Sequence, residues 1–144
     1  MACASSADRQ LSSNDCLVAR VEAAVLQALE EVEPAEPNRD HLGLPFITAY
    51  QLAIKVDRIL PELTEELGVA VGGEGTGQHN SLTSYLAHQL SQRIKDPTRN
   101  FGVEGAQLSN VDVAEMSFRT ADGEVISSSN VGARYDLSMF RLRR

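Results

Sequence analysis

Residues 46–59 restrict the fold more than any other segment, because they predict a helix that is apolar around most of its circumference. Its polar side chains lie along a single narrow stripe, with Asp57 off it: Thr48, Gln51, Lys55 and Arg58. A helix with so little polar surface is typically buried, and Pro45 suits its first turn. We therefore expect residues 46–59 to form the central core helix of the protein.

A longer helix is predicted before it, over residues 13–33. Apolar side chains recur there every three or four residues, Ser13 or Asn14 can cap the start, and Pro34 ends the pattern. The other side of this helix carries acids that we expect to form a solvated face: Glu22, Glu30, Glu31 and Glu33. The apolar stripe suits packing on the chain's own domain, or against a twin helix in a homodimer.

Two further helices are predicted after the central one. Pro61 starts a short helix that Gly68 ends. Asn80 or Ser81 caps another helix, which stops before Pro97 because the residue that precedes a proline avoids helical angles.

The last third of the chain predicts β-structure. Residues 113–120 alternate, the Asp122–Gly123 pair indicates a hairpin turn, and residues 124–128 form the return strand. Residues 135–142 predict a third strand. The fold class is therefore α+β, with three to four helices followed by a small antiparallel sheet of a β-hairpin and a C-terminal strand. Periodicity alone predicts the following core residues: Tyr50, Ile54, Leu82, Leu86, Leu90, Met116 and Phe118.

The 144 residues suit one domain. Residues 1–12 have no apolar pattern and are expected to be disordered. Residues 13–144 then form a single α+β domain, in which residues 13–33 are either an integral helix or an arm joined by the proline-containing linker 34–45.

The net charge of −7 argues against non-specific binding of nucleic acid or of a membrane surface by the whole protein. No signal-peptide pattern and no apolar window long enough for a membrane span occur. Cys3 and Cys16 form no disulfide framework, which favours a reducing compartment. We expect a cytoplasmic protein.

A glycine-rich loop followed by a helix is the candidate binding surface, over residues 72–95. No carboxylate occurs from Gly75 to Lys95, although the chain is acidic. The loop's glycines permit close approach of another molecule, and the helix N-terminus favours an anion. The candidate ligand- or partner-binding residues are Gly73, Gly75, Gly77, His79, Asn80, Ser84, His88, Gln92 and Lys95.

Known chemical motifs are not found in this stretch. Gly77 is followed by Gln78 rather than by the lysine of a phosphate-binding loop, and the dinucleotide-binding pattern also fails. None of the three histidines, His41, His79 and His88, has metal-ligand spacing. The sequence therefore predicts no catalytic residue, no metal site and no cofactor.

These patterns favour a non-enzymatic, acidic interaction module that binds another protein through residues 72–95. One alternative is a winged-helix-like nucleic-acid-binding protein that uses residues 79–95 and the hairpin. A second alternative is a small anionic ligand at the glycine-rich loop.

Overall fold

The computed structural model describes residues 13–36, 38, 40–72, 81–127 and 137–143. Their fold is α+β, as the sequence predicts. The helices are α1 (Ser13–Glu30), α2 (Ala49–Ile59), α3 (Glu62–Leu67) and α4 (Leu82–Lys95), with a 3-10 turn at Asp40–Leu42. The strands are β1 (Ile47–Thr48), β2 (Val103–Leu108), β3 (Ser117–Arg119), β4 (Val125–Ser127) and β5 (Leu137–Leu142).

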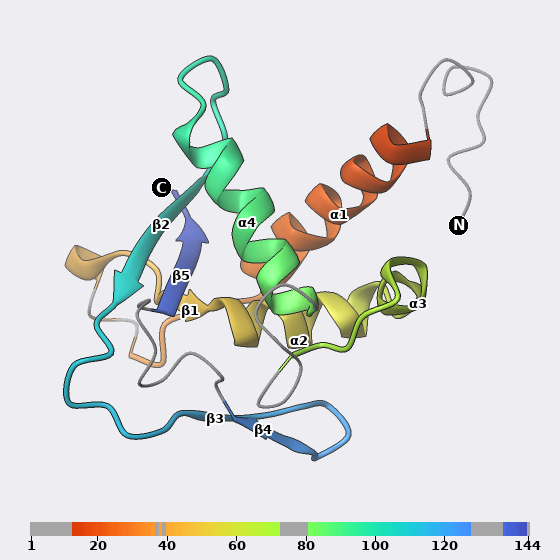
Figure 1. Cartoon of the computed structure of the whole chain (residues 1–144). Helices are drawn as coiled ribbons and strands as arrows, with labels where there is room; N and C mark the ends of the chain where they lie inside the picture. The colour runs from red at the N-terminus through yellow and green to blue at the C-terminus, as the bar shows by residue number, and fades with distance from the viewer. Residues whose placement is uncertain (1–12, 37, 39, 73–80, 128–136, 144) are drawn as a thin grey trace.

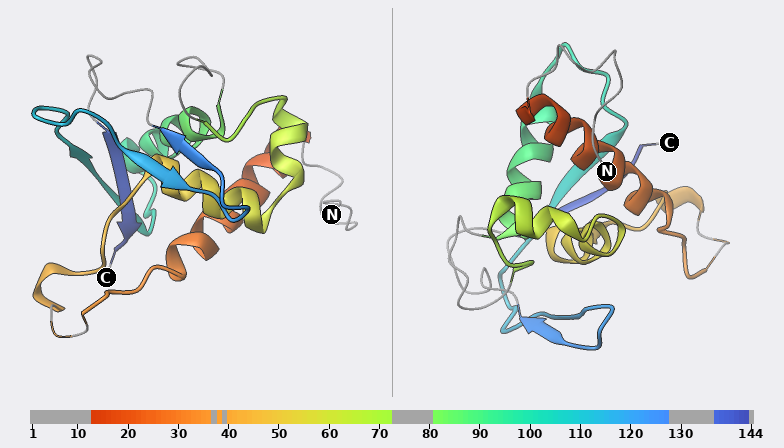
Figure 2. Two further views of the ribbon diagram at one scale, coloured as in Figure 1. Left: turned by 90° about the horizontal axis from the view of Figure 1, so that it is seen from below. Right: turned by 90° about the vertical axis from the view of Figure 1, so that its right-hand side faces the viewer.

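The strands are divided between two antiparallel sheets. One has the order β1-β5-β2, with Phe140 of β5 opposite both Ile47 and Gly105. The other is the β3–β4 hairpin, in which Phe118 lies opposite Ile126. In Figure 1 the three-stranded sheet lies at one end of α2, and α1 and α4 lie across α2. The hairpin lies on the side of α2 away from α1 and α4, as both views in Figure 2 also show.

Helix α2 is the centre of the core, as expected. Leu52, Ala53 and Val56 are fully buried, between side chains from α1 and α4. From α1, the apolar stripe contributes Val21, Val25 and Ala28 to the same cluster. The largest part of the core is therefore helical and surrounds α2.

The start of α2 differs from the predicted helix over residues 46–59. Ile47 and Thr48 form β1, and Thr48 is the N-cap of α2. The Thr48 amide donates to Gln51 Oε1 at 2.7 Å, and the Gln51 amide donates to Thr48 Oγ1 at 3.2 Å. This reciprocal capping box satisfies two amides at the helix start, and pairing with β5 draws the residues before it into the sheet.

Strand β2 is absent from the sequence prediction. Its alternate positions do not separate into an apolar and a polar side, and Gly105 at its centre lowers its strand propensity. The glycine has a packing role, because a Cβ there would lie 3.3 Å from Ile94 Cδ1 of α4. The predicted strand over residues 113–120 is shortened to residues 117–119, after a turn in which Asp112 has a positive φ of 65°.

Four of the seven predicted core residues are buried: Tyr50, Leu82, Leu86 and Leu90. The other three, Ile54, Met116 and Phe118, are half-buried. Two of these, Ile54 and Phe118, lie between α2 and the hairpin, where the protein is hollowed rather than filled. Periodicity identified the inward side of each segment but not how closely the opposite segment approaches.

Three of the four acids predicted to form a solvated face, Glu30, Glu31 and Glu33, are exposed, whereas Glu22 is half-buried. Glu22 accepts from Arg93 at 3.1 Å and from Arg99 at 2.9 Å, and Glu31 pairs with Arg58 of α2. The pairing of Glu22 and Glu31 is absent from the sequence prediction because the arginines that reach these acids lie far away in the sequence.

Cys16 is disulfide-bonded, which also differs from the sequence expectation of no disulfide. The argument for a reducing compartment drawn from the two cysteines therefore has no structural support.

The first stability prediction concerns Leu86, whose side chain is fully buried. Leu86→Ala removes apolar contacts and leaves a cavity, so we expect it to lower the free energy of unfolding by about 2–5 kcal/mol. Leu42→Ala is the control, because Leu42 is 58% exposed. Urea unfolding of both variants measures the difference, and equal midpoints would show that the inward side of α4 is assigned wrongly.

The second stability prediction concerns the ion pair between Glu22 and Arg93, whose side chains are 25% and 8% exposed. Glu22→Gln leaves a buried guanidinium without its counter-charge, and we expect a loss of about 1–3 kcal/mol in the free energy of unfolding. Glu30→Gln on the same helix is the matched control, because Glu30 is exposed and pairs with none of the described residues. A loss of equal size in both variants would mean that the Glu22 contacts contribute nothing specific.

Candidate functional site

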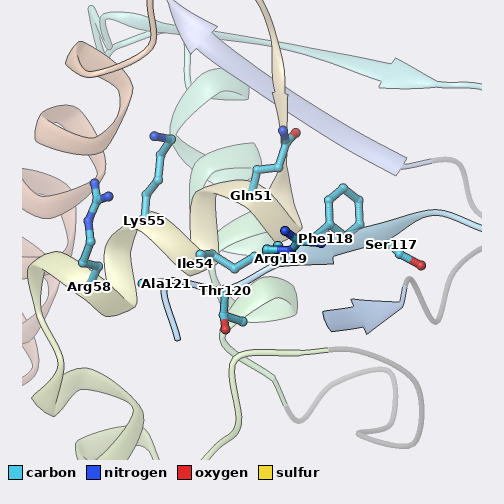
Figure 3. A pocket seen from close by; sticks show the side chains of 9 residues that line it. All are labelled: Gln51, Ile54, Lys55, Arg58, Ser117, Phe118, Arg119, Thr120 and Ala121. Atoms are coloured by element: carbon cyan, nitrogen blue, oxygen red, sulfur yellow. The ribbon is translucent and has the colours of Figure 1, made fainter. Parts of the chain in front are cut away.

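A pocket of about 430 Å³ lies between α2 and the β3 side of the hairpin. Its volume is in the range of small-ligand sites. Figure 3 shows its lining, in which α2 contributes one wall and residues 117–121 contribute the other. The lining residues are Gln51, Ile54, Lys55, Arg58, Ser117, Phe118, Arg119, Thr120 and Ala121.

The α2 wall is the polar stripe of the central helix. Gln51, Lys55 and Arg58 follow one another at spacings of four and three residues, which places them on one side of a helix. Gln51 Oε1 is occupied by the Thr48 amide, so its Nε2 is the part of the amide that remains to donate. The capping box that starts α2 therefore also orients a polar group of the pocket.

The hairpin wall is held against α2 by an aromatic contact. The rings of Phe118 and Tyr50 stack with centroids 5.2 Å apart and an interplanar angle of 7°. The turn of the hairpin is set by Gly123, which has a φ of 87° and donates to Thr120 O at 3.0 Å. Glu124 N donates to Thr120 Oγ1 at 3.1 Å, so the hydroxyl proton of Thr120 remains to donate to a ligand. The predicted hairpin turn is confirmed.

The charge of the lining is positive. Lys55, Arg58 and Arg119 contribute three cations, and none of the nine lining residues is an acid. Arg58 pairs with Glu31, whereas Lys55 and Arg119 form no ion pair with any described residue. By contrast, four arginines elsewhere are bound by carboxylates: Arg20, Arg93, Arg99 and Arg141.

Three carboxylates lie near the pocket without lining it: Asp57, Asp122 and Glu115. Burial raises the pKa of Asp57 on α2; the hydrogen bond from Thr64 opposes this rise, and the charge of Asp122 in the hairpin turn adds to it. Another acid, Glu115, accepts from Ser127 at 2.9 Å and from Ser117 at 3.5 Å. Ser117 is therefore already engaged within the hairpin, and the neutral donors left for a ligand are Gln51 and Thr120.

The sequence-predicted surface lies elsewhere. Ser84 is half-buried, while His88, Gln92 and Lys95 are exposed, so the four share the outward side of α4. None of the four lines the pocket. The other candidates lie outside the described residues: Gly73, Gly75, Gly77, His79 and Asn80.

The N-terminus of α4 is already bound by its own chain. The amides of Leu82 and Thr83 donate to Ala70 O at 2.8 Å and Val71 O at 3.0 Å, and the amide of Ser84 donates to Ser81 Oγ at 3.1 Å. Gly72 fits beside this turn only without a side chain, because a Cβ would lie 2.6 Å from Thr83 Oγ1. The first-turn amides that an anion would need are therefore used by the protein itself.

Sequence reasoning missed the pocket, although one half of it was visible. The stripe of Gln51, Lys55 and Arg58 stands out on an otherwise apolar helix. The second half required tertiary structure, because nothing local places Arg119 opposite that stripe. A polar stripe on an otherwise apolar helix is therefore the sequence signal that could have identified the α2 wall of the pocket.

The raised pKa of Asp57 gives a prediction of pH dependence. The folded protein holds a proton at Asp57 more readily than the unfolded chain, so this group lowers the stability as pH rises above 3.8 and through the raised pKa. We expect Asp57→Asn to raise the melting temperature at pH 7, and the gain to vanish on acidification. Asp96→Asn is the opposite control, because hydrogen bonds from Thr98 lower the pKa of Asp96. Thermal melts from pH 3 to pH 7 test both signs; an Asp57→Asn gain that does not change with pH would contradict the assignment.

Comparison with known proteins gives no functional assignment. No protein-family model, curated protein or solved structure matches this chain. Among the described residues, no helix is long and apolar enough to cross a membrane. Function has to be argued from the side chains of the site, since a fold class alone is compatible with many functions.

Proposed function

We propose that this chain is a non-enzymatic binding module that holds an acidic segment of another protein in the pocket between α2 and the hairpin. The observation that carries the proposal is that three cations line one concave site of a protein with a net charge of −7. Cations that are not neutralised within the chain favour an anionic partner, and they steer it toward the pocket before contact.

The remaining lining supports a peptide rather than a bare ion. Ile54, Phe118 and Ala121 supply apolar contact area beside the cations, and a mixed apolar and polar lining is typical of sites that orient an organic group. The lining contains no carboxylate, histidine or cysteine, the side chains that most often serve as general acid, general base or activated nucleophile. This composition supports binding as the role of the site.

The winged-helix alternative receives less support from the arrangement of the elements. Reading a duplex with the outward side of α4 and the hairpin would need both on one face, whereas they lie on opposite sides of α2 (Figures 1 and 2). The described arginines near α4, Arg93 and Arg99, are both bound by Glu22. A nucleic-acid backbone is followed by a row of free cations, whereas two of the cations that form no ion pair with any described residue, Lys55 and Arg119, line one pocket.

Other sequence expectations stay predictions. The stripe of α1 packs in the protein's own core, which gives no reason to prefer a homodimer through residues 13–33. A cytoplasmic location and a small anionic ligand at the glycine-rich loop likewise rest on the sequence alone.

The proposal is tested by titrating the full chain with a glutamate-rich peptide that contains one leucine, monitored by amide chemical shifts in NMR spectra. We expect shifts at residues 51–58 and 117–121. Lys55→Gln and Arg119→Gln should each weaken binding about tenfold, which corresponds to about 1.4 kcal/mol for a lost charged contact. Added salt should weaken binding as well, since screening acts on exposed charges.

Lys95→Gln is the matched control, because Lys95 is also a lysine on a helix without an ion pair among the described residues. Its peptide affinity should equal that of the unmodified protein. Loss of affinity in Lys95→Gln and His88→Ala, with none in Lys55→Gln, would place the site on α4 instead. Equal binding of a lysine-rich peptide, or no binding of the acidic one, would show that the proposed function is wrong.

A further inference from the structure

We infer that the anion recognised in the pocket is a phosphoryl group carried on a side chain of the partner protein. This inference rests on the proposed function and narrows it, because an acidic segment can present carboxylates, phosphoryl groups or both. Three features of the pocket support it: the charge of its lining, the kinds of hydrogen-bond donors that it contains, and the apolar side chains beside those donors.

The charge of the pocket matches a dianion better than a monoanion. The lining side chains Lys55, Arg58 and Arg119 carry three positive charges, and Glu31, bound to Arg58, offsets one of them. The acids Asp57, Glu115 and Asp122 lie near the pocket without lining it. One carboxylate matches only one of the two remaining lining cations, whereas a phosphorylated serine, threonine or tyrosine carries about −1.5 to −2 at pH 7 and matches nearly both.

The donors suit a group with three terminal oxygens. Arg119 offers a guanidinium fork that no described carboxylate occupies, and such a fork binds two oxygens of one phosphoryl group. Lys55 adds a point charge from the opposite wall. Gln51 Nε2 and the Thr120 hydroxyl add neutral donors, because hydrogen bonds within the chain occupy the acceptor atoms Gln51 Oε1 and Thr120 Oγ1. Figure 3 shows these side chains coming from both walls of the pocket.

The apolar part of the lining indicates that the phosphoryl group is attached to a side chain. Phe118 is fixed by its stack on Tyr50, and Ile54 lies on the α2 wall. Both offer contact to the carbon atoms that carry the phosphate and to an apolar neighbour in the peptide. A nucleic acid is less favoured, because it would present a further phosphate every few ångströms to surfaces where Arg20, Arg93 and Arg99 are already paired.

The experiment compares three peptides that differ at one position, which holds phosphoserine, glutamate or serine, with a leucine beside it. Calorimetric titration of the full chain at pH 7 should give an affinity for the phosphopeptide about tenfold or more above that for the glutamate peptide, as expected for an added charge-assisted contact. The serine peptide should bind weakest. Lowering the pH from 7 to 5 should reduce the phosphopeptide's advantage, because its second pKa is about 6.

Arg119→Lys separates charge from geometry. It keeps the positive charge but removes the fork, so we expect it to lose most of the preference for phosphoserine over glutamate while still binding both peptides. Arg143→Lys is the matched control, because Arg143 lies outside the pocket and pairs with none of the described residues. Its preference should be unchanged.

The outcomes separate this inference from the proposed function. Equal affinity for the phosphoserine and glutamate peptides overturns the phosphoryl assignment and leaves the acidic-segment module standing. Failure of all three peptides overturns both. A single-stranded oligonucleotide that binds more tightly than the phosphopeptide, with a steep salt dependence and with shifts at the pocket residues, also overturns the inference and identifies the partner as nucleic acid.

Discussion

The burial of α2 is the constraint on which the rest of the structure depends. Tyr50, Leu52, Ala53 and Val56 are each buried, on successive sides of the same short helix. Such a helix has to be covered almost all round, since each apolar side left in water costs free energy. Helices α1 and α4 cover one side, and the hairpin lies against another (Figures 1 and 2). The only polar side is the stripe of Gln51, Lys55 and Arg58, and the pocket forms where the hairpin meets this stripe.

The same packing determines which acidic side chains are paired with arginines. Arginines connect elements that are distant in the sequence: Arg20 of α1 binds Glu62 and Glu66 of α3, and Arg93 of α4 binds Glu22 of α1. Arg141 of β5 donates to Leu42 O and Leu44 O and packs over the Phe46 ring at 4.2 Å. Most of these pairs are partly exposed and stabilise the fold modestly. Their larger consequence is that they occupy these cations, whereas Lys55 and Arg119 form no ion pair with any described residue.

The sequence alone was sufficient for the elements with strong periodicity. The inward sides of α2 and α4, the left-handed stop at Gly68 and the turn at Gly123 all follow from local chemistry, and the structure has them. It was insufficient where a partner from elsewhere in the chain decides the outcome. Strand β2 forms because β5 pairs with it and Gly105 lets α4 approach, and neither fact is visible in VEGAQL. The pocket is missing from the sequence prediction for the same reason, since the acid-free stretch 75–95 is a local pattern and the pocket is a tertiary one.

The hairpin is the part of the site that depends most on contacts with the rest of the protein. Two strands of three residues, Ser117–Arg119 and Val125–Ser127, are too short to be stable alone. Their position depends on the stack of Phe118 on Tyr50. The charge of Asp122 in the turn repels Asp57 on α2 and so acts against this docking; the same repulsion adds to burial in raising the pKa of Asp57. An anion between Lys55 and Arg119 would add an attraction between the same two walls. If the proposed anion binds there, contacts to Arg119 would also hold the hairpin against α2, so binding and hairpin docking would stabilise one another.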